Sequence, residues 1–300
     1  LRAPSDGKCF SVEKEDAEIM DESTKKQLGI LATRIRMGAV TGVFHAKSGH
    51  PGGSLSIADL LAYLYSKELR VDPQNPKWAD RDRLVLSKGH CAPALYAALA
   101  LRGFFPEEEL CRLRHIGAML QGHPDMKGTP GVDMSTGSLG QGVSAAAGMA
   151  LAAKLGGAEY RTYAILGDGE IEEGQVWEAA MFAAHKKLDN LCLIVDNNNL
   201  QIDGTLDEVN SPYPIPEKFA AFGFHVIEIN GHDFDEIESA LSEARTVKGC
   251  PTAIIMKTVK GKGVSYMENA VGWHGSAPNA EQYETAMADL KRILAQYEEG

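Results

Sequence analysis

The sequence has no excess of basic residues, and this lack excludes several classes of protein. Lys and Arg total 30 against 41 Asp and Glu, which gives a formal net charge of −11 at pH 7. A general nucleic-acid binder or a basic membrane-surface protein needs clustered Lys and Arg to replace counterions, so neither is expected. A local site for a phosphate group is still compatible with this charge.

Long apolar runs and paired cysteines are also missing. The longest apolar candidate, the Ala- and Gly-rich segment 143–153, is too short to span a membrane and is typical of a tightly packed buried helix. The N-terminus has no apolar signal core. Because the chain starts at Leu1 and not at Met, we interpret residues 1–15 as an extension, either trimmed or left by cloning. The 5 cysteines are scattered without a C-x-x-C pair, which argues against zinc or redox chemistry and favours reduced thiols in the cytoplasm.

What the sequence does contain is an alternation of short aliphatic runs with longer helical patterns, without internal repeats. A helix is predicted over 16–46, followed by a loop at Ser48–Ser54. The alternation predicts an α/β fold, with a mainly parallel sheet, helices on both faces and a single domain over 16–300. Ligands of such sheets bind beyond the carboxyl ends of the strands. The predicted strands are Arg83–Ser87, Thr162–Leu166, Leu191–Val195, His225–Ile229 and Thr252–Lys257, and the other predicted helices are Ser56–Leu69, Ala92–Arg102, 141–155, 173–187, 214–222, 233–246 and Glu281–Tyr297.

Two polar segments follow neighbouring strands and carry the strongest chemical signal. Gly167-Asp168-Gly169 ends one predicted strand and Asp196-Asn197-Asn198 ends the next, so Asp168 and Asn198 are expected side by side. Mg²⁺ prefers oxygen ligands from carboxylates, neutral carbonyls and phosphates, which predicts ligation by Asp168, Asn198 and a backbone carbonyl near Leu200. The two glycines allow a diphosphate close to the backbone, and the helix beginning near Glu173 is expected to direct its amides toward it.

Each of these segments alone is common in turns and polar loops. With a strand ahead of each and a helix between them, the pair resembles the fingerprint of thiamine-diphosphate enzymes. Histidine motifs in Gly- and Pro-rich loops extend the resemblance, and over residues 30–278 the chain looks like the N-terminal section of a transketolase. These motifs are Ser48-Gly49-His50-Pro51-Gly52, Leu86-Ser87-Lys88-Gly89-His90, Gly122-His123-Pro124, Thr136-Gly137-Ser138-Leu139-Gly140-Gln141-Gly142 and Trp273-His274-Gly275.

The resemblance implies catalytic roles for four histidines. His90 and His274 are expected to contact the diphosphate and the C2 side of the thiazolium, while His50 and His123 line the donor pocket. Imidazole titrates near neutrality, which suits a reaction that moves protons on and off hydroxyl oxygens.

The resemblance also assigns residues around the cofactor and at a subunit contact. Glu173 and Glu178 match family acidic residues at the dimer interface. The residues expected to bind the cofactor, besides His90 and His274, are Gly137, Leu139, Gly169 and Asn198.

The implied reaction transfers a two-carbon ketol unit from a ketose phosphate to an aldose phosphate, with thiamine diphosphate as electron sink. The implied ion is Mg²⁺, with Ca²⁺ or Mn²⁺ as substitutes. In the family a second domain binds the aminopyrimidine and supplies an activating glutamate, which cannot be assigned in this chain. We expect a cytoplasmic enzyme of the pentose phosphate pathway. Because the activating glutamate is not in this chain, we expect the chain to form a homodimer and, with a C-terminal partner subunit, an active heterotetramer. The alternative is that the chain is a fragment of a longer protein.

Other interpretations stay open. A deoxyxylulose-phosphate synthase or a 2-oxo acid dehydrogenase component shares the Asp/Asn fingerprint, although the histidine set disfavours both. The sequence does not exclude a split transketolase for an unusual sugar phosphate, because acceptor selectivity lies largely on the missing domains. A catalytically silent regulatory or scaffold subunit is disfavoured by the intact Asp168 and Asn198.

Two residues depart from the family pattern beside the cofactor loops. Lys88 stands where many transketolases have a neutral residue, and Ser138 stands where many have proline. We interpret Lys88 as a solvated or interface charge, with a direct role left open by its closeness to His90.

Overall fold

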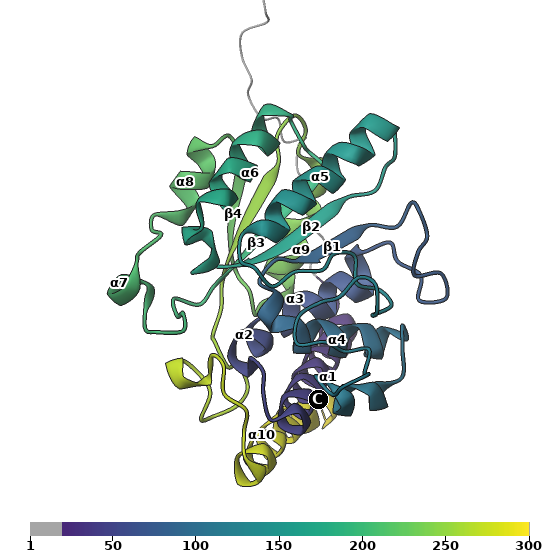
Figure 1. Cartoon of the computed structure of the whole chain (residues 1–300), viewed down its shortest axis with the longest axis vertical. Helices are drawn as coiled ribbons and strands as arrows, with labels where there is room; N and C mark the ends of the chain where they lie inside the picture. The colour runs from purple at the N-terminus through teal and green to yellow at the C-terminus, as the bar shows by residue number, and fades with distance from the viewer. Residues whose placement is uncertain (1–19, 300) are drawn as a thin grey trace, which may run out of the picture.

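A five-stranded, fully parallel sheet forms the centre of the molecule, with helices on both sides (Figure 1). The computed structural model describes residues 20–299. The strand order is β1-β2-β3-β5-β4, and every predicted strand is present within two residues of its expected ends. The predicted α/β fold with a mainly parallel sheet is confirmed. The strands are β1 (Arg83–Leu86), β2 (Thr162–Gly167), β3 (Leu191–Asn197), β4 (His225–Asn230) and β5 (Thr252–Lys257).

Two helix layers bury the two faces of the sheet. One layer contains α5 (Gln141–Gly156), α6 (Gly174–His185) and α8 (Ile215–Ala221), and the other contains α1 (Glu22–Ala46), α3 (Ala58–Tyr63), α4 (Ala92–Arg102) and α9 (Phe234–Thr246) (Figure 1). Alternate strand residues point to opposite faces, so each strand contributes to both cores. In β3, Leu193 and Val195 pack under the first layer, and Cys192 and Ile194 pack under the second.

The long helix α1 has a defined start and end. The Asp21 carboxylate accepts the backbone N–H of Thr24, and Lys47 ends the helix in the left-handed conformation at φ 52°. The predicted helix over 16–46 is therefore observed from Glu22, and its residues 16–19 lie outside the described part of the chain. The predicted closing helix is observed as α10 (Ala280–Glu299), which lies against α1.

The glycine-rich segment after α1 is not the loop predicted at Ser48–Ser54. A helix, α2 (Pro51–Ser56), begins inside it and carries a proline in its first turn, where the missing N–H needs no partner. Its glycines serve close packing, because a Cβ on Gly53 would meet the sulfur of Cys91 at 2.7 Å. The composition of the segment did not distinguish a tightly packed helix from a loop.

The helix predicted over Ser56–Leu69 is divided into two parts. α3 ends at Tyr63, and a π-helical turn, Leu64–Glu68, completes the segment. Every residue of α3 is buried, so apolar spacing could not show where the winding changes.

The described residues, 20–299, include no helix with the length and apolarity needed to cross a membrane. Cys91, Cys111 and Cys192 carry free thiols, but Cys250 is disulfide-bonded. The expectation of reduced thiols therefore holds at these three positions and fails at Cys250. The extension 1–15 lies outside the described residues.

Candidate functional site

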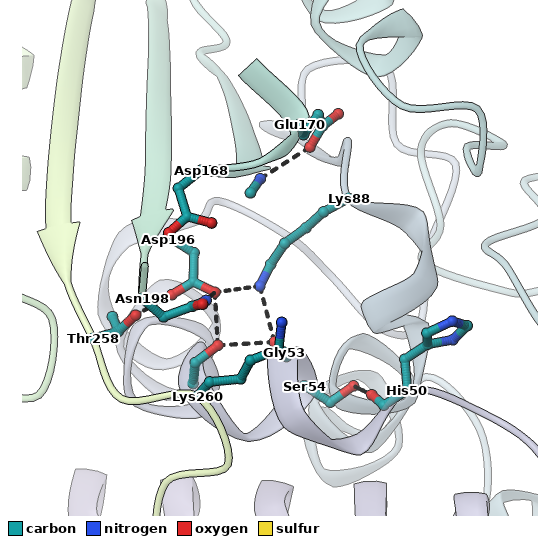
Figure 2. Close-up of polar contacts among 12 residues, drawn as sticks. His50, Gly53, Ser54, Lys88, Asp168, Glu170, Asp196, Asn198, Thr258 and Lys260 are labelled. Atoms are coloured by element: carbon teal, nitrogen blue, oxygen red, sulfur yellow. Dashed lines mark hydrogen bonds and ion pairs between the residues drawn. The ribbon is translucent and has the colours of Figure 1, made fainter. Parts of the chain in front are cut away.

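A cavity of about 290 Å³ opens at the carboxyl edge of the sheet, where the loops after β1, β2, β3 and β5 meet (Figure 2). This is the edge at which open α/β sheets bind ligands. Most of the site residues predicted from the sequence line it. They are His50, His90, Gly137, Leu139, Asp168, Gly169, Asn198, Leu200 and His274.

Asp168 and Asn198 lie at adjacent strand ends, as the sequence predicts. Gly167 of β2 pairs with Asp196 of β3, and the Asp168 N–H donates to the Asp196 carbonyl at 3.3 Å. Asp168, Asn198 and Leu200 line the same cavity, and Figure 2 shows the first two side chains close together. The cavity thus brings together a carboxylate, a side-chain amide and a backbone carbonyl.

The carboxylate of Asp168 is buried, and no ion pair among the described residues neutralises it. Its side-chain oxygens accept the backbone N–H groups of Gly169 at 2.9 Å and Asn199 at 2.6 Å. Burial and the nearby charge of Asp196 raise the pKa of Asp168 to about 7. A bound cation would favour the ionised form, so the site fits an ion that prefers oxygen ligands.

The types of donor atom around Asp168 also fit an ion that prefers oxygen ligands. Within residues 20–299 there is no group of three or more His, Cys, Asp or Glu that could hold a metal. The candidate set around Asp168 instead mixes one carboxylate with neutral oxygens, leaving positions for phosphate oxygens, and this is the pattern that Mg²⁺ accepts.

Lys260 is a cavity residue that the sequence analysis missed. Its Nζ donates to the Leu200 carbonyl at 2.7 Å and lies 2.8 Å from Nδ1 of His274. Burial lowers the pKa of Lys260 to about 8. Its role could have been predicted from its position in the sequence, because Lys260 begins the long loop after the last strand, at the edge of the sheet where ligands bind. Its position lets it hold a phosphate group beside the candidate ion.

Lys88 is buried, so its interpretation as a solvated or interface charge is wrong. Its side chain is 2% exposed, and Nζ lies 2.5 Å from Oδ2 of Asp196 and donates to the Gly53 carbonyl at 2.9 Å (Figure 2). Burial disfavours both charges, but their attraction outweighs it, raising the pKa of Lys88 and lowering that of Asp196. The two residues are 108 positions apart, and only the order of the strands brings them together.

Asp196 also orients the candidate metal ligand Asn198. Its Oδ2 accepts hydrogen bonds from Nδ2 of Asn198 at 3.0 Å and from Oγ of Ser56 at 2.7 Å. Its Oδ1 accepts a hydrogen bond from the hydroxyl of Thr258. Because Asp196 holds the amide nitrogen of Asn198, the amide oxygen of Asn198 faces away from Asp196. This oxygen accepts a hydrogen bond from the Leu200 N–H at 3.1 Å. In the sequence Asp196 is recognisable only as a strand end, so this contact was not predicted.

The four predicted histidines converge from four separate segments. The ring centroid of His50 lies 5.2 Å from that of His90, 5.5 Å from that of His274 and 6.4 Å from that of His123. The rings of His90 and His274 stack at 5.2 Å. His123 is next to His50 without lining the cavity itself, so the histidines form one cluster that extends beyond the cavity.

Burial favours the neutral forms of these histidines, so their pKa values lie below that of a free imidazole. Burial, with nearby positive charges, lowers the pKa of His50 to about 4 and that of His274 to about 3. Burial also lowers the pKa of His90 and of His123. Nδ1 of His50 is buried and has no hydrogen-bond partner within the described residues. A ligand hydroxyl could satisfy this atom.

Glu173 and Glu178 lie outside the cavity. Both are exposed, Glu173 at the cap of α6 and Glu178 within that helix. The first residues of α6 do not line the cavity either, because a short 3₁₀ turn, Glu170–Glu172, separates the strand end from the helix. The expectation that the amides of this helix face the diphosphate therefore stays a prediction.

Comparison with known proteins gives consistent matches. Residues 28–293 match the family described as "Transketolase, thiamine diphosphate binding domain". The chain is 51% identical over 244 residues to the 6-deoxy-6-sulfo-D-fructose transketolase subunit SqwG of Clostridium sp. (strain MSTE9), covering 81% of this chain and 89% of that protein. It is 42% identical over 284 residues to one of the subunits of the apulose-4-phosphate transketolase of Phocaeicola vulgatus, covering 95% of this chain and 97% of that protein.

A solved structure agrees with these sequence matches. The transketolase from Campylobacter jejuni superposes with a TM-score of 0.82 at 34% sequence identity. The match covers 91% of this chain but 48% of the Campylobacter chain. This chain thus spans most of the two bacterial subunits but less than half of the full-length enzyme.

Proposed function

This chain belongs to the transketolase family, and from that premise we propose that it is the diphosphate-binding subunit of a split, thiamine-diphosphate-dependent transketolase. One observation carries the proposal: Asp168, Asn198 and the Leu200 carbonyl line a single cavity together with neutral histidines. A silent scaffold subunit would have no use for this combination of oxygen ligands and uncharged imidazoles.

The residues of the cavity divide the work of holding the cofactor. Asp168, Asn198 and the Leu200 carbonyl would hold Mg²⁺, with Ca²⁺ or Mn²⁺ as substitutes, and Lys260 and His90 would face the diphosphate. Gly137, Leu139 and Gly169 would flank the cofactor, with His274 near the thiazolium. Thiamine diphosphate, when bound, supplies the electron sink that the protein itself lacks.

The neutral histidines suit the handling of sugar hydroxyls. A neutral imidazole offers one donor and one acceptor, so it can accept a hydroxyl proton on one nitrogen while it donates from the other. His50 is placed for this role because its buried Nδ1 has no partner among residues 20–299. His123 adjoins it, with the two ring centroids 6.4 Å apart, and would line the donor pocket with it.

We propose that the donor is a ketose carrying an anionic group, from which a two-carbon ketol unit passes to an aldose. The Clostridium relative is named for a sulfonated fructose and the Phocaeicola relative for apulose 4-phosphate. These names support assaying an unusual sugar beside the pentose-phosphate sugars. A phosphate and a sulfonate present similar anionic oxygens at the end of the sugar.

We propose that activity requires a C-terminal partner subunit that supplies the pyrimidine-binding domain and its activating glutamate. Both curated relatives are named as subunits, which supports this assembly. The exposed Glu173 and Glu178 would lie in the contact between two copies of this chain, in a cytoplasmic heterotetramer with two copies of each subunit.

Reconstitution tests the proposal. The purified chain should be a dimer by light scattering and should show no ketol transfer with thiamine diphosphate and Mg²⁺. Adding the partner should restore transfer from a ketose phosphate or from 6-deoxy-6-sulfofructose. Robust transfer by the chain alone would overturn the split-enzyme proposal, and turnover of pyruvate as donor by the complex would favour a synthase of the deoxyxylulose-phosphate type.

A further inference from the structure

We infer that Glu170 is a positioning residue for the cofactor, because its buried carboxylate ties together three segments that carry residues of the cavity lining. This inference rests on the proposed function for its ligand. Glu170 is 2% exposed, although the sequence marks it only as one of several acidic residues after Asp168. It forms no part of the candidate metal set.

Three donors from three separate segments converge on this carboxylate. Its Oε1 accepts the hydroxyl of Ser87, which follows β1, and the backbone N–H of Gly140 at 2.9 Å, which precedes α5. Its Oε2 accepts the backbone N–H of Gly167 at 3.0 Å, at the end of β2. Figure 2 shows Glu170 with its carboxylate turned toward a backbone nitrogen. Ser87 is fully buried and Glu170 is 2% exposed, so losing one of these hydrogen bonds would leave a buried polar group without its partner.

The segment 137–140 is held at both ends, and Glu170 provides one of the two anchors. At the other end, the hydroxyl of Thr136 donates to the Leu86 carbonyl at 2.7 Å. Space there is tight, since a Cβ on Gly89 would meet the Thr136 hydroxyl at 2.7 Å. Leu139 lies between the anchors and lines the cavity at 36% exposure. A flexible loop at this point would let the wall move away from the cofactor.

Position 170 requires a side chain that only accepts hydrogen bonds. Two of the three partners are backbone N–H groups, which can only donate, and they sit on different carboxylate oxygens. A glutamine has one amide oxygen and one NH₂ group, so it would point a donor at either Gly140 or Gly167. Glu170→Gln therefore breaks at least one anchor while conserving size and shape.

The test combines hydrogen exchange of the chain alone with binding of thiamine diphosphate and Mg²⁺, measured by calorimetry. In Glu170→Gln, exchange should accelerate in the peptides that contain Gly140 and Gly167 and stay unchanged in β3 and β5. Affinity for thiamine diphosphate should fall on the order of 10-fold, as for other residues that act through a ligand's neighbours. Glu284→Gln, on the exposed face of α10, is the matched control and should change neither quantity.

The outcomes separate this inference from the proposed function. Wild-type affinity with unchanged exchange in Glu170→Gln would overturn the positioning role, as would acceleration spread over the whole sheet, which signals general destabilisation. If the wild-type chain, alone and with its partner, binds no thiamine diphosphate, the proposed function fails instead. If Glu170→Gln does not fold, Ser87→Ala is the second variant, because it removes one hydrogen-bond donor to Glu170 and keeps the carboxylate. Weaker binding of thiamine diphosphate by Ser87→Ala would support the inference, and unchanged binding would overturn it.

Discussion

Replacing Lys88 by methionine isolates the cost of leaving Asp196 without its buried partner. Methionine has a similar length and apolar stem, so packing around the side chain is largely conserved. Removing one member of a buried ion pair typically costs about 3–5 kcal/mol. Asp196 keeps hydrogen bonds from Ser56, Thr258 and Asn198. We therefore expect the lower end of that range, about 3 kcal/mol.

This free energy translates into a measurable melting shift. An unfolding entropy of about 2.1 cal/mol/K per residue, over roughly 300 residues, converts about 3 kcal/mol into a decrease of about 5 °C in Tm. Calorimetry of the metal-free chain measures it. The control is Lys154→Met, which breaks the half-exposed pair between Lys154 and Asp189 at 2.8 Å and should cost less than about 1 kcal/mol.

The pH dependence gives a second check on the same variant. In the folded chain burial opposes ionisation of Asp196, but Lys88 and the hydrogen bonds to the carboxylate lower its pKa. Stability from a lowered carboxyl pKa is present above the unfolded pKa and is lost as pH falls through the folded value. Without Lys88, that charge no longer offsets the effect of burial on the Asp196 pKa, so this carboxyl can take up a proton more readily and the Tm deficit of Lys88→Met should shrink as the pH is lowered.

Two outcomes would refute this reasoning about the pair. One is a Lys88→Met deficit no larger than that of Lys154→Met. The other is a double variant, Lys88→Met with Asp196→Asn, that is as unstable as the single variant, because removing both charges should recover much of the loss.

The remaining predictions concern the cavity. Asp168→Ala should abolish Mg²⁺-dependent binding of thiamine diphosphate while leaving the melting profile largely intact, because it removes the only carboxylate assigned to the ion; calorimetry showing wild-type affinity would contradict that assignment. His50→Ala and His274→Ala should each lower turnover of the reconstituted enzyme more than they lower Tm, since both rings line the cavity. Normal specific activity with a large loss of Tm would instead identify these histidines as packing residues.

The sequence by itself determined the fold class and the positions of the strands, because each strand is a short aliphatic run bounded by polar residues. The placement of Asp168 beside Asn198 followed from that pattern, since parallel neighbouring strands end at the same edge of the sheet. Local patterns worked less well for α2, where glycines serve close packing inside a helix, and for the winding after α3, where every residue is buried.

Only the tertiary structure decided which distant polar groups meet. The contacts of Lys88, Glu170 and Lys260 could not be read from the sequence, because their partners Asp196, Ser87 and Leu200 lie 108, 83 and 60 positions away. The histidines were found by their motifs, yet their neutrality came from burial and from neighbouring charges such as Lys260. Spacing along a chain records which residues can share an element, whereas burial and electrostatic environment depend on how separate elements pack, and that is why the sequence located this cavity but not the contacts that support it.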